Sequence, residues 1–254
     1  MSSFEQELNL LFPKKDTIFH FLGRYLFHPT NNVWGLITRY YDAYLAKADE
    51  RISIQIRVFY KGTSLFQIIL DQILSCALKE KLLPNVNRKQ HDVITATGNQ
   101  KSKAVLMTSL SSGYYEKLRD MYFEHPTETG DLISVYQPSN EVNQQTDKLV
   151  HDQKALAEMY LLSFSDVLIT SSRSTFGYVA QGLGGLKSWL LYKPEENKTV
   201  LDSGCRRVMG MEPCFHDPTL YDCKRKSVID IGGDSVPHLR HCEDVSEGIK
   251  IVDV

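Results

Sequence analysis

Hydrophobic positions along the chain change their spacing several times, and each change marks a different kind of element. Residues 31–48 repeat apolar side chains every three or four positions, which predicts an amphipathic helix. Residues 51–58 alternate strictly between polar and apolar side chains, which predicts a strand. Both patterns then recur in turn, with helices expected at 64–78, 112–122, 147–162 and 174–183 and strands at 103–109, 131–136, 166–170 and 189–192. This order predicts right-handed βαβ units around a parallel sheet.

The alternation divides the chain into three parts. Residues 50–195 are expected to form an α/β domain with a Rossmann-like, doubly wound parallel sheet. Residues 1–49 are interpreted as a linker that carries the amphipathic helix, and residues 196–254 as a cysteine-containing, loop-rich extension packed on the domain.

Five cysteines narrow the choice of environment. The disulfide candidates lie near the C-terminus and are Cys205, Cys214, Cys223 and Cys242, whereas Cys76 falls in an apolar helical pattern and is expected to be a buried thiol. No tight C-x2-4-C pair is present, so disulfides are favoured over free thiols, and both over a zinc site. A metal cluster of His238 and His241 with Cys242, Glu243 and Asp244 is the remaining alternative. Disulfides imply an oxidising compartment, and Asn197 begins a glycosylation sequon.

Composition excludes several classes of protein. The chain has 254 residues, a formal net charge of −2, 24% charged and 42% hydrophobic residues, as an ordinary globular protein does. No long basic run points to nucleic acid. No apolar run approaches 18 residues, and the N-terminus does not resemble a signal peptide, so the sequence reads as the interior of a longer protein.

Candidate chemistry gathers where the predicted strands end, which is where open α/β sheets bind ligands. Arg57 ends the first strand, Thr108 and Ser109 the second, Tyr136 and Gln137 the third, and residues 170–175 follow the fourth. Ser174 and Thr175 begin a helix, so they either cap it or help to hold an anion at its positive end. Arg57 is either a surface arginine or a bidentate ligand for a diphosphate.

The absence of three nucleotide-binding motifs restricts the kind of ligand that the chain is expected to bind. The chain has no G-x-G-x-x-G after its first strand, no GxxxxGK[ST] and no Asp-x-Asp. A dinucleotide site of the NAD type, a P-loop and an Asp-x-Asp metal site are therefore not visible. The remaining hypothesis is a nucleoside diphosphate held without metal by an arginine and a helix N-terminus.

Five long motifs carry a family resemblance over nearly the whole chain. They are LGRYLFHPTNNVWG (22–35), ISIQIRVF (52–59), LAEMYLLSFSDVLITSSRSTFGYVAQGLGGLKSWLLY (156–192), MEPCFHDP (211–218) and VPHLRHCED (236–244). They resemble the plant xyloglucan fucosyltransferases, glycosyltransferase family 37. The resemblance implies the donor-binding half of a GT-B enzyme that transfers L-fucose from GDP-fucose to galactose O2 of xyloglucan or a related cell-wall glycan, with inversion and without metal or other cofactor. It also implies the Golgi lumen, a membrane anchor, and a homodimer or other glycosyltransferases as partners.

The resemblance implies roles for particular residues. The motif IQIRVF makes Arg57 the diphosphate-binding arginine. The motif STFGY places Ser174, Thr175, Phe176, Gly177 and Tyr178 around GDP, and VYQPS places Tyr136 and Gln137 near the nucleotide. Arg173 departs from the smaller or aromatic residue expected there.

No catalytic base is assigned from the sequence. His28, His125 and His151 are candidates, although each also fits a surface or structural histidine. Family members are longer, with a first Rossmann-like domain that is expected to hold most of the acceptor site. Two alternatives therefore stay open beside the enzyme: a truncated, non-catalytic protein that binds GDP or a partner, and an unrelated Rossmann-like binding module.

Overall fold

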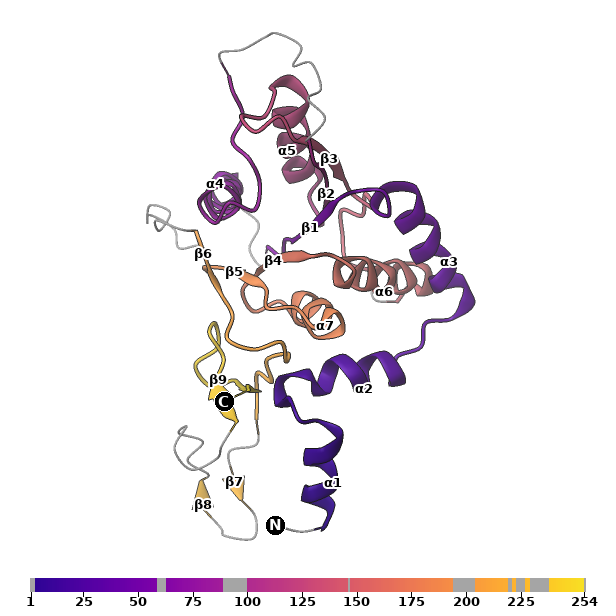
Figure 1. The fold of residues 1–254 in the computed structure, drawn as a ribbon, viewed down its shortest axis with the longest axis vertical. Helices are drawn as coiled ribbons and strands as arrows, with labels where there is room; N and C mark the ends of the chain where they lie inside the picture. Colours follow the sequence, from indigo (N-terminus) through magenta and orange to yellow (C-terminus); the bar gives the residue numbers. More distant parts are fainter. Residues whose placement is uncertain are drawn as a thin grey trace.

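The fold is built on one sheet of six strands. A computed structural model describes residues 3–58, 63–88, 100–145, 147–193, 204–218, 221–222, 227–228 and 238–253. The strands are β1 (Glu50–Gln55), β2 (Ser102–Thr108), β3 (Leu132–Tyr136), β4 (Val167–Ser171), β5 (Trp189–Leu191) and β6 (Cys205–Arg207). Their order is β3-β2-β1-β4-β5-β6, and all neighbours are parallel except the antiparallel pair β5 and β6 (Figure 1). The predicted Rossmann-like sheet is confirmed, and it extends past residue 195 to include β6.

Helices cover both faces of the sheet because successive strand residues point to opposite sides. On one face, Val105 and Met107 of β2 pack against α4 (Thr63–Lys79) and α5 (Ser112–Glu124). On the other face, Ala104 and Leu106 pack against α3 (Asn31–Tyr40), α6 (Leu149–Ser163) and α7 (Thr175–Gly184). Strands buried on both sides explain the apolar run that marked β2 in the sequence.

The N-terminal segment contains more helix than the sequence indicated. Two further helices, α1 (Ser3–Leu11) and α2 (Ile18–Leu26), follow one another and are joined by a 3-10 turn, η1 (Lys15–Thr17). The helix predicted over 31–48 is α3, continued as a π-helical segment η2 (Tyr41–Leu45). Helix α2 lies along α7, where His20 Nδ1 and Arg24 Nε both lie within hydrogen-bond distance of the carbonyl oxygen of Leu183, at 2.9 and 2.7 Å. The described helices include none that is both long and apolar enough to cross a membrane.

Two disulfides join distant parts of the chain. Cys76 of α4 is bonded to Cys205 of β6, and Cys214 is bonded to Cys242. The expectation of a free buried thiol at Cys76 is wrong: helical periodicity identified its buried position, but its partner lies 129 residues further along the chain. Cys223 and Asn197 lie outside the described residues.

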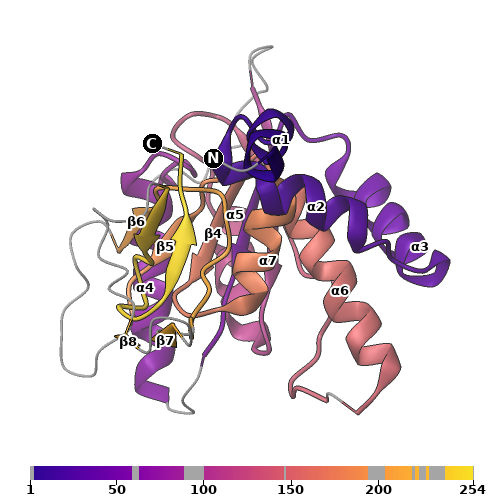
Figure 2. The ribbon, with the colours of Figure 1, turned by 90° about the horizontal axis from the view of Figure 1, so that it is seen from below.

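The C-terminal segment returns to the N-terminal helices. It contains the small antiparallel pairs β7 (Tyr221–Asp222) with β8 (Ser227–Val228) and β9 (Leu239–His241) with β10 (Ile249–Ile251). The two ends of the chain lie on the same side of the molecule (Figure 2). A hydrogen bond from the backbone N–H of Lys15 to Asp253 Oδ1, at 3.1 Å, connects them.

Candidate functional site

A cavity lies where the chain reverses its winding around the sheet. After β1 the chain enters α4 on one face, whereas after the neighbouring strand β4 it enters α7 on the other. The two connections therefore diverge at the carboxyl ends of β1 and β4 and leave a crevice, the usual ligand position in such sheets. A cavity of about 460 Å³ opens there.

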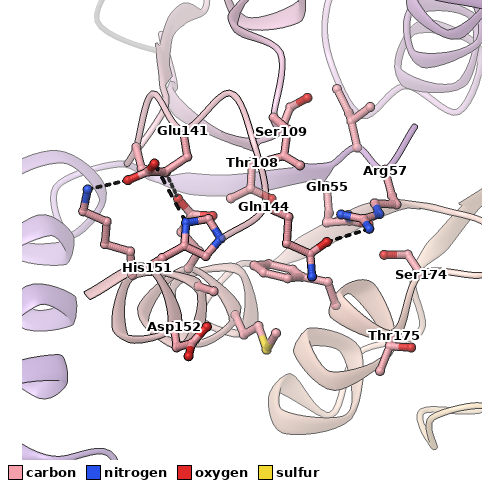
Figure 3. A pocket seen from close by; sticks show the side chains of 18 of the residues that line it. Gln55, Arg57, Thr108, Ser109, Glu141, Gln144, His151, Asp152, Ser174 and Thr175 are labelled. Atoms are coloured by element: carbon pink, nitrogen blue, oxygen red, sulfur yellow. Dashed lines mark hydrogen bonds and ion pairs between the residues drawn. The ribbon is translucent and has the colours of Figure 1, made fainter. Parts of the chain in front are cut away.

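Arg57 stands at the edge of this cavity because it directly follows the end of β1. Its backbone N–H donates to Ser171 Oγ at 3.0 Å, which ties the ends of β1 and β4 together. Its Nη2 donates to Gln144 Oε1 at 2.8 Å, so the guanidinium is held over the cavity (Figure 3). The structure thus places this arginine where the sequence analysis expected it.

The start of α7 forms the neighbouring wall, lined by Ser174, Thr175 and Phe176. Ser174 is the N-cap, and its Oγ accepts the backbone N–H of Gly177 at 3.4 Å. The capping interpretation is therefore correct for Ser174, and it leaves the positive end of the helix dipole facing the cavity. An anion in the cavity would meet this helix end on one side and the Arg57 guanidinium on the other.

Gly177 is required by packing against the sheet. A Cβ built on it would overlap Thr170 Oγ1 and would lie 2.9 Å from Thr170 Cβ and 3.1 Å from Gln55 Oε1. Thr170 and Gln55 are buried and joined by a hydrogen bond of 2.7 Å between Thr170 Oγ1 and Gln55 Oε1. The glycine lets α7 begin directly above the ends of β1 and β4, which brings its first turn to the cavity.

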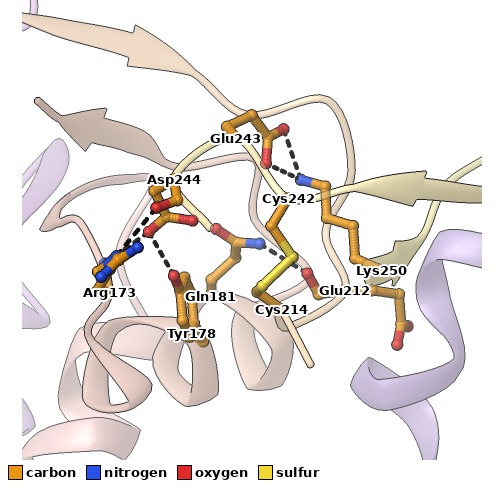
Figure 4. The surroundings of a disulfide bond; sticks show 9 residues. All are labelled: Arg173, Tyr178, Gln181, Glu212, Cys214, Cys242, Glu243, Asp244 and Lys250. Atoms are coloured by element: carbon orange, nitrogen blue, oxygen red, sulfur yellow. Dashed lines mark hydrogen bonds and ion pairs between the residues drawn. A yellow bond between two sulfur atoms is a disulfide. The ribbon is translucent and has the colours of Figure 1, made fainter. Parts of the chain in front are cut away.

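Three residues expected near the nucleotide are not among those that line the cavity. Tyr136 packs against Tyr44, with ring centroids 5.0 Å apart. Gln137 Nε2 donates to the carbonyl oxygens of Ser139, at 2.8 Å, and Ser109, at 3.4 Å, so it joins the loops that follow β2 and β3. Tyr178 points toward the C-terminal segment, where its hydroxyl donates to Asp244 (Figure 4). These side chains shape the loops around the cavity.

The far wall carries charged residues that sequence reasoning missed. Burial raises the pKa of Glu158 to about 7, and the 2.5 Å hydrogen bond from Ser139 Oγ to its Oε1 opposes that rise only in part. The pKa of Glu141 is lowered by a 2.6 Å bond to Lys154 Nζ. Both Glu158 and Lys154 lie on α6, where the helical period placed them without showing that their face lines a cavity.

Thr108 adds a hydroxyl to the cavity at the end of β2. Its Oγ1 is buried, and no hydrogen bond to another group of the described residues satisfies it. A buried, unpaired hydroxyl is costly unless a ligand or water pairs with it. The sequence analysis named this position because it ends a strand, and the structure makes it part of the same cavity as Arg57.

The candidate bases have separate positions. His151 lines the cavity, with Nδ1 3.8 Å from a carboxylate oxygen of Glu141. His28 is exposed between α2 and α3. His125 follows α5, which runs back along the sheet, so it lies near the strand ends opposite the cavity. Of the three, His151 alone is at the cavity.

The metal-cluster alternative near the C-terminus is not supported by the side chains that it needs. Cys242 is in a disulfide, Glu243 pairs with Lys250 Nζ at 2.6 Å, and Asp244 Oδ2 accepts the backbone N–H of Arg173 at 2.6 Å. Within the described ranges, no three His, Cys, Asp or Glu side chains converge as a metal site.

Comparison with known proteins identifies the family. A family model described as xyloglucan fucosyltransferase matches residues 1–224. A galactoside 2-alpha-L-fucosyltransferase from Pisum sativum is 67% identical over 253 residues, which is 100% of this chain and 44% of that protein. The protein of the same name from Arabidopsis thaliana is 60% identical over 253 residues, 98% of this chain and 44% of its own length. The chain thus spans less than half the length of the curated relatives it matches.

A solved structure agrees with this relationship. A mutant of Arabidopsis thaliana FUT1 in complex with GDP superimposes with a TM-score of 0.83 at 59% identity, covering 98% of this chain and 53% of that one. An unrelated Rossmann-like module is therefore excluded. The chain belongs to the xyloglucan fucosyltransferase family.

Proposed function

We propose that the cavity between Arg57 and the start of α7 binds the diphosphate of GDP-fucose, and that the chain is the donor-binding part of a fucosyltransferase. The acceptor is the galactose O2 of xyloglucan or a related cell-wall glycan, and the transfer inverts the configuration at the fucose carbon without a metal. One observation carries the proposal. Arg57 follows β1 and α7 follows β4, and the two line the same cavity where the connections after these neighbouring strands diverge to opposite faces of the sheet.

The arrangement suits a leaving diphosphate. As the acceptor hydroxyl attacks C1 of fucose, the bond to GDP breaks and negative charge grows on the β-phosphate. The Arg57 guanidinium and the first-turn N–H groups of α7 would stabilise that charge, and loss of one such preorganised donor typically slows a reaction about 10²–10³-fold. The buried hydroxyl of Thr108 is a further donor for the bound nucleotide sugar.

His151 is the base candidate that the geometry favours, because it lines the donor cavity beside Glu141. Its role requires the acceptor hydroxyl to approach from the α6 side of the cavity. The two disulfides fit an oxidising compartment, in keeping with the Golgi lumen that we propose as the location.

Calorimetry with GDP, GDP-fucose and ADP in the presence of EDTA tests the proposal. We expect GDP-selective binding without metal, and Arg57→Ala should weaken it about 100-fold or more, as the loss of charge-assisted hydrogen bonds implies. Arg119→Ala is the matched control, since Arg119 is an arginine on the exposed surface of α5 whose partner is the adjacent Asp120. Equal GDP affinity in the wild type and Arg57→Ala would refute the assignment.

The second candidate is a protein that binds the donor without transferring fucose. It is favoured by the cavity itself, whose arginine and helix N-terminus account for binding of the donor but not of an acceptor. A transfer assay with GDP-fucose and xyloglucan separates the two. GDP binding together with fucosylated product supports the enzyme, and GDP binding without product supports a donor-binding protein that needs a further part.

A further inference from the structure

The turn between β4 and α7 has a backbone conformation that its sequence does not favour. Arg173 has a φ of 57°, in the left-handed region that residues with a Cβ rarely adopt. It directly precedes Ser174, the N-cap of α7, and both residues line the cavity. The conformation of this one residue therefore aims the helix start at the proposed diphosphate position, and something must hold it there.

One carboxylate from the far end of the chain holds this turn. Asp244 Oδ2 accepts the backbone N–H of Arg173 at 2.6 Å, and the Asp244 carbonyl accepts Nε of the same arginine at 3.3 Å. The hydroxyl of Tyr178 donates to the same carboxylate oxygen (Figure 4). Asp244 thus grips both the residue before the cap and the first turn of α7.

The position of Asp244 is set in turn by a stapled C-terminal segment. Two residues earlier, Cys242 is bonded to Cys214, and the backbone N–H of Cys242 donates to the carbonyl oxygen of Gly248 at 3.0 Å. Between them, Glu243 accepts the backbone N–H of Met209 at 2.7 Å and pairs with the buried Nζ of Lys250 at 2.6 Å. The carboxylate that holds the turn is therefore anchored on both sides.

We propose that Asp244 is a positioning residue for the diphosphate site, and that the Cys214–Cys242 disulfide sets that position from the C-terminal segment. The carboxylate does not line the cavity: it acts through Arg173 and Tyr178. Its charge alone would disfavour a bound diphosphate, so a benefit to binding must come through geometry. The effect on nucleotide binding rests on the function proposed above, whereas the effect on the turn does not.

Amide hydrogen exchange without nucleotide tests the effect on the turn. In the 254-residue chain, Asp244→Ala and the pair Cys214→Ser with Cys242→Ser should speed exchange in the segment 172–178. Asp244→Asn, which keeps an oxygen to accept the Arg173 N–H, should be closer to the wild type. Asp253→Ala is the control, since Asp253 lies in the same segment but accepts from Lys15. Unchanged exchange at 172–178 in Asp244→Ala overturns the proposal.

Calorimetry with GDP and with guanosine tests the effect on binding, because guanosine lacks the phosphates. Asp244→Ala should weaken GDP binding about 10- to 100-fold, the size of a lost charge-assisted hydrogen bond, with guanosine binding unchanged. Equal losses for GDP and guanosine would mean a general loss of structure and overturn the positioning role. Tighter GDP binding in Asp244→Ala would show that the carboxylate acts through its charge, and it would also overturn the positioning role. If the wild-type chain binds no GDP, the proposed function is refuted, and the exchange measurement still decides whether Asp244 holds the turn.

Discussion

The half-buried side chain of Glu158 leads to a quantitative prediction about stability and pH. Its pKa rises from the ordinary value of 4.5 to about 7, mainly because the side chain is buried. Since a tenfold shift in a protonation equilibrium corresponds to about 1.4 kcal/mol, ionised Glu158 costs the folded protein about 3 kcal/mol. Replacing it by glutamine should remove that cost and retain an oxygen to accept the hydrogen bond from Ser139.

The direction of the effect follows from proton linkage. Between pH 4.5 and about 7 the folded protein holds the Glu158 proton and the unfolded chain does not. The folded state therefore binds more protons, and the free energy of unfolding falls as pH rises through this window. The contribution is fully present below pH 4.5 and is lost above about 7. Burial also raises the pKa of Glu212, to about 6. This group therefore adds a further decrease in the unfolding free energy, over a narrower pH range.

Urea denaturation at pH 5 and pH 8, followed by circular dichroism, measures this difference. Between pH 5 and pH 8, the unfolding free energy of Glu158→Gln should rise by about 2–3 kcal/mol relative to that of the wild type, because at pH 5 the wild type has already lost part of the contribution. The residual slope should reflect Glu212. Glu116→Gln is the matched control, since Glu116 is an exposed glutamate of α5. A Glu158→Gln profile parallel to that of the wild type would refute the reasoning and show that the carboxylate is ionised or solvated in the fold.

Two further predictions concern packing and covalent links. Gly177→Ala should destabilise the protein by about 1–3 kcal/mol, because the new Cβ overpacks against Thr170. Gly35→Ala in α3 should instead stabilise it by up to about 1 kcal/mol through helix propensity, because its new Cβ meets only the flexible end of Arg39. Thermal unfolding measures both changes, and equal effects would contradict the close contact between Gly177 and Thr170. Replacing Cys76 and its partner by alanine should lower the unfolding free energy by about 2–5 kcal/mol, since the link closes a long loop between α4 and β6. Non-reducing urea denaturation measures that loss, and a loss below about 1 kcal/mol would argue against this pairing.

The sequence by itself determined the kind of sheet and one corner of the site. Strand and helix periods are local, so the alternation from residue 50 onward could be read directly, and it predicted a Rossmann-like parallel sheet, which the structure confirms apart from the antiparallel strand β6. The rule that ligands lie at the carboxyl ends of strands then brought Arg57 and Ser174 to one cavity without any knowledge of their contacts. Both results depend only on neighbours along the chain and on general rules of handedness.

Only the tertiary structure decided which side chains meet. A helical period marks Cys76 as buried, yet it does not reveal its disulfide partner on β6. The same kind of period assigns Glu158 to one side of α6 without showing that this side borders a cavity. In the sequence Arg173 stood out only as a departure from the family resemblance. Its left-handed conformation and its contact with Asp244, 71 positions away, belong to the tertiary structure. Periodicity reports the side of an element on which a residue lies, whereas burial of charge, pairing of cysteines and support of a strained turn arise from contacts between elements that folding alone brings together.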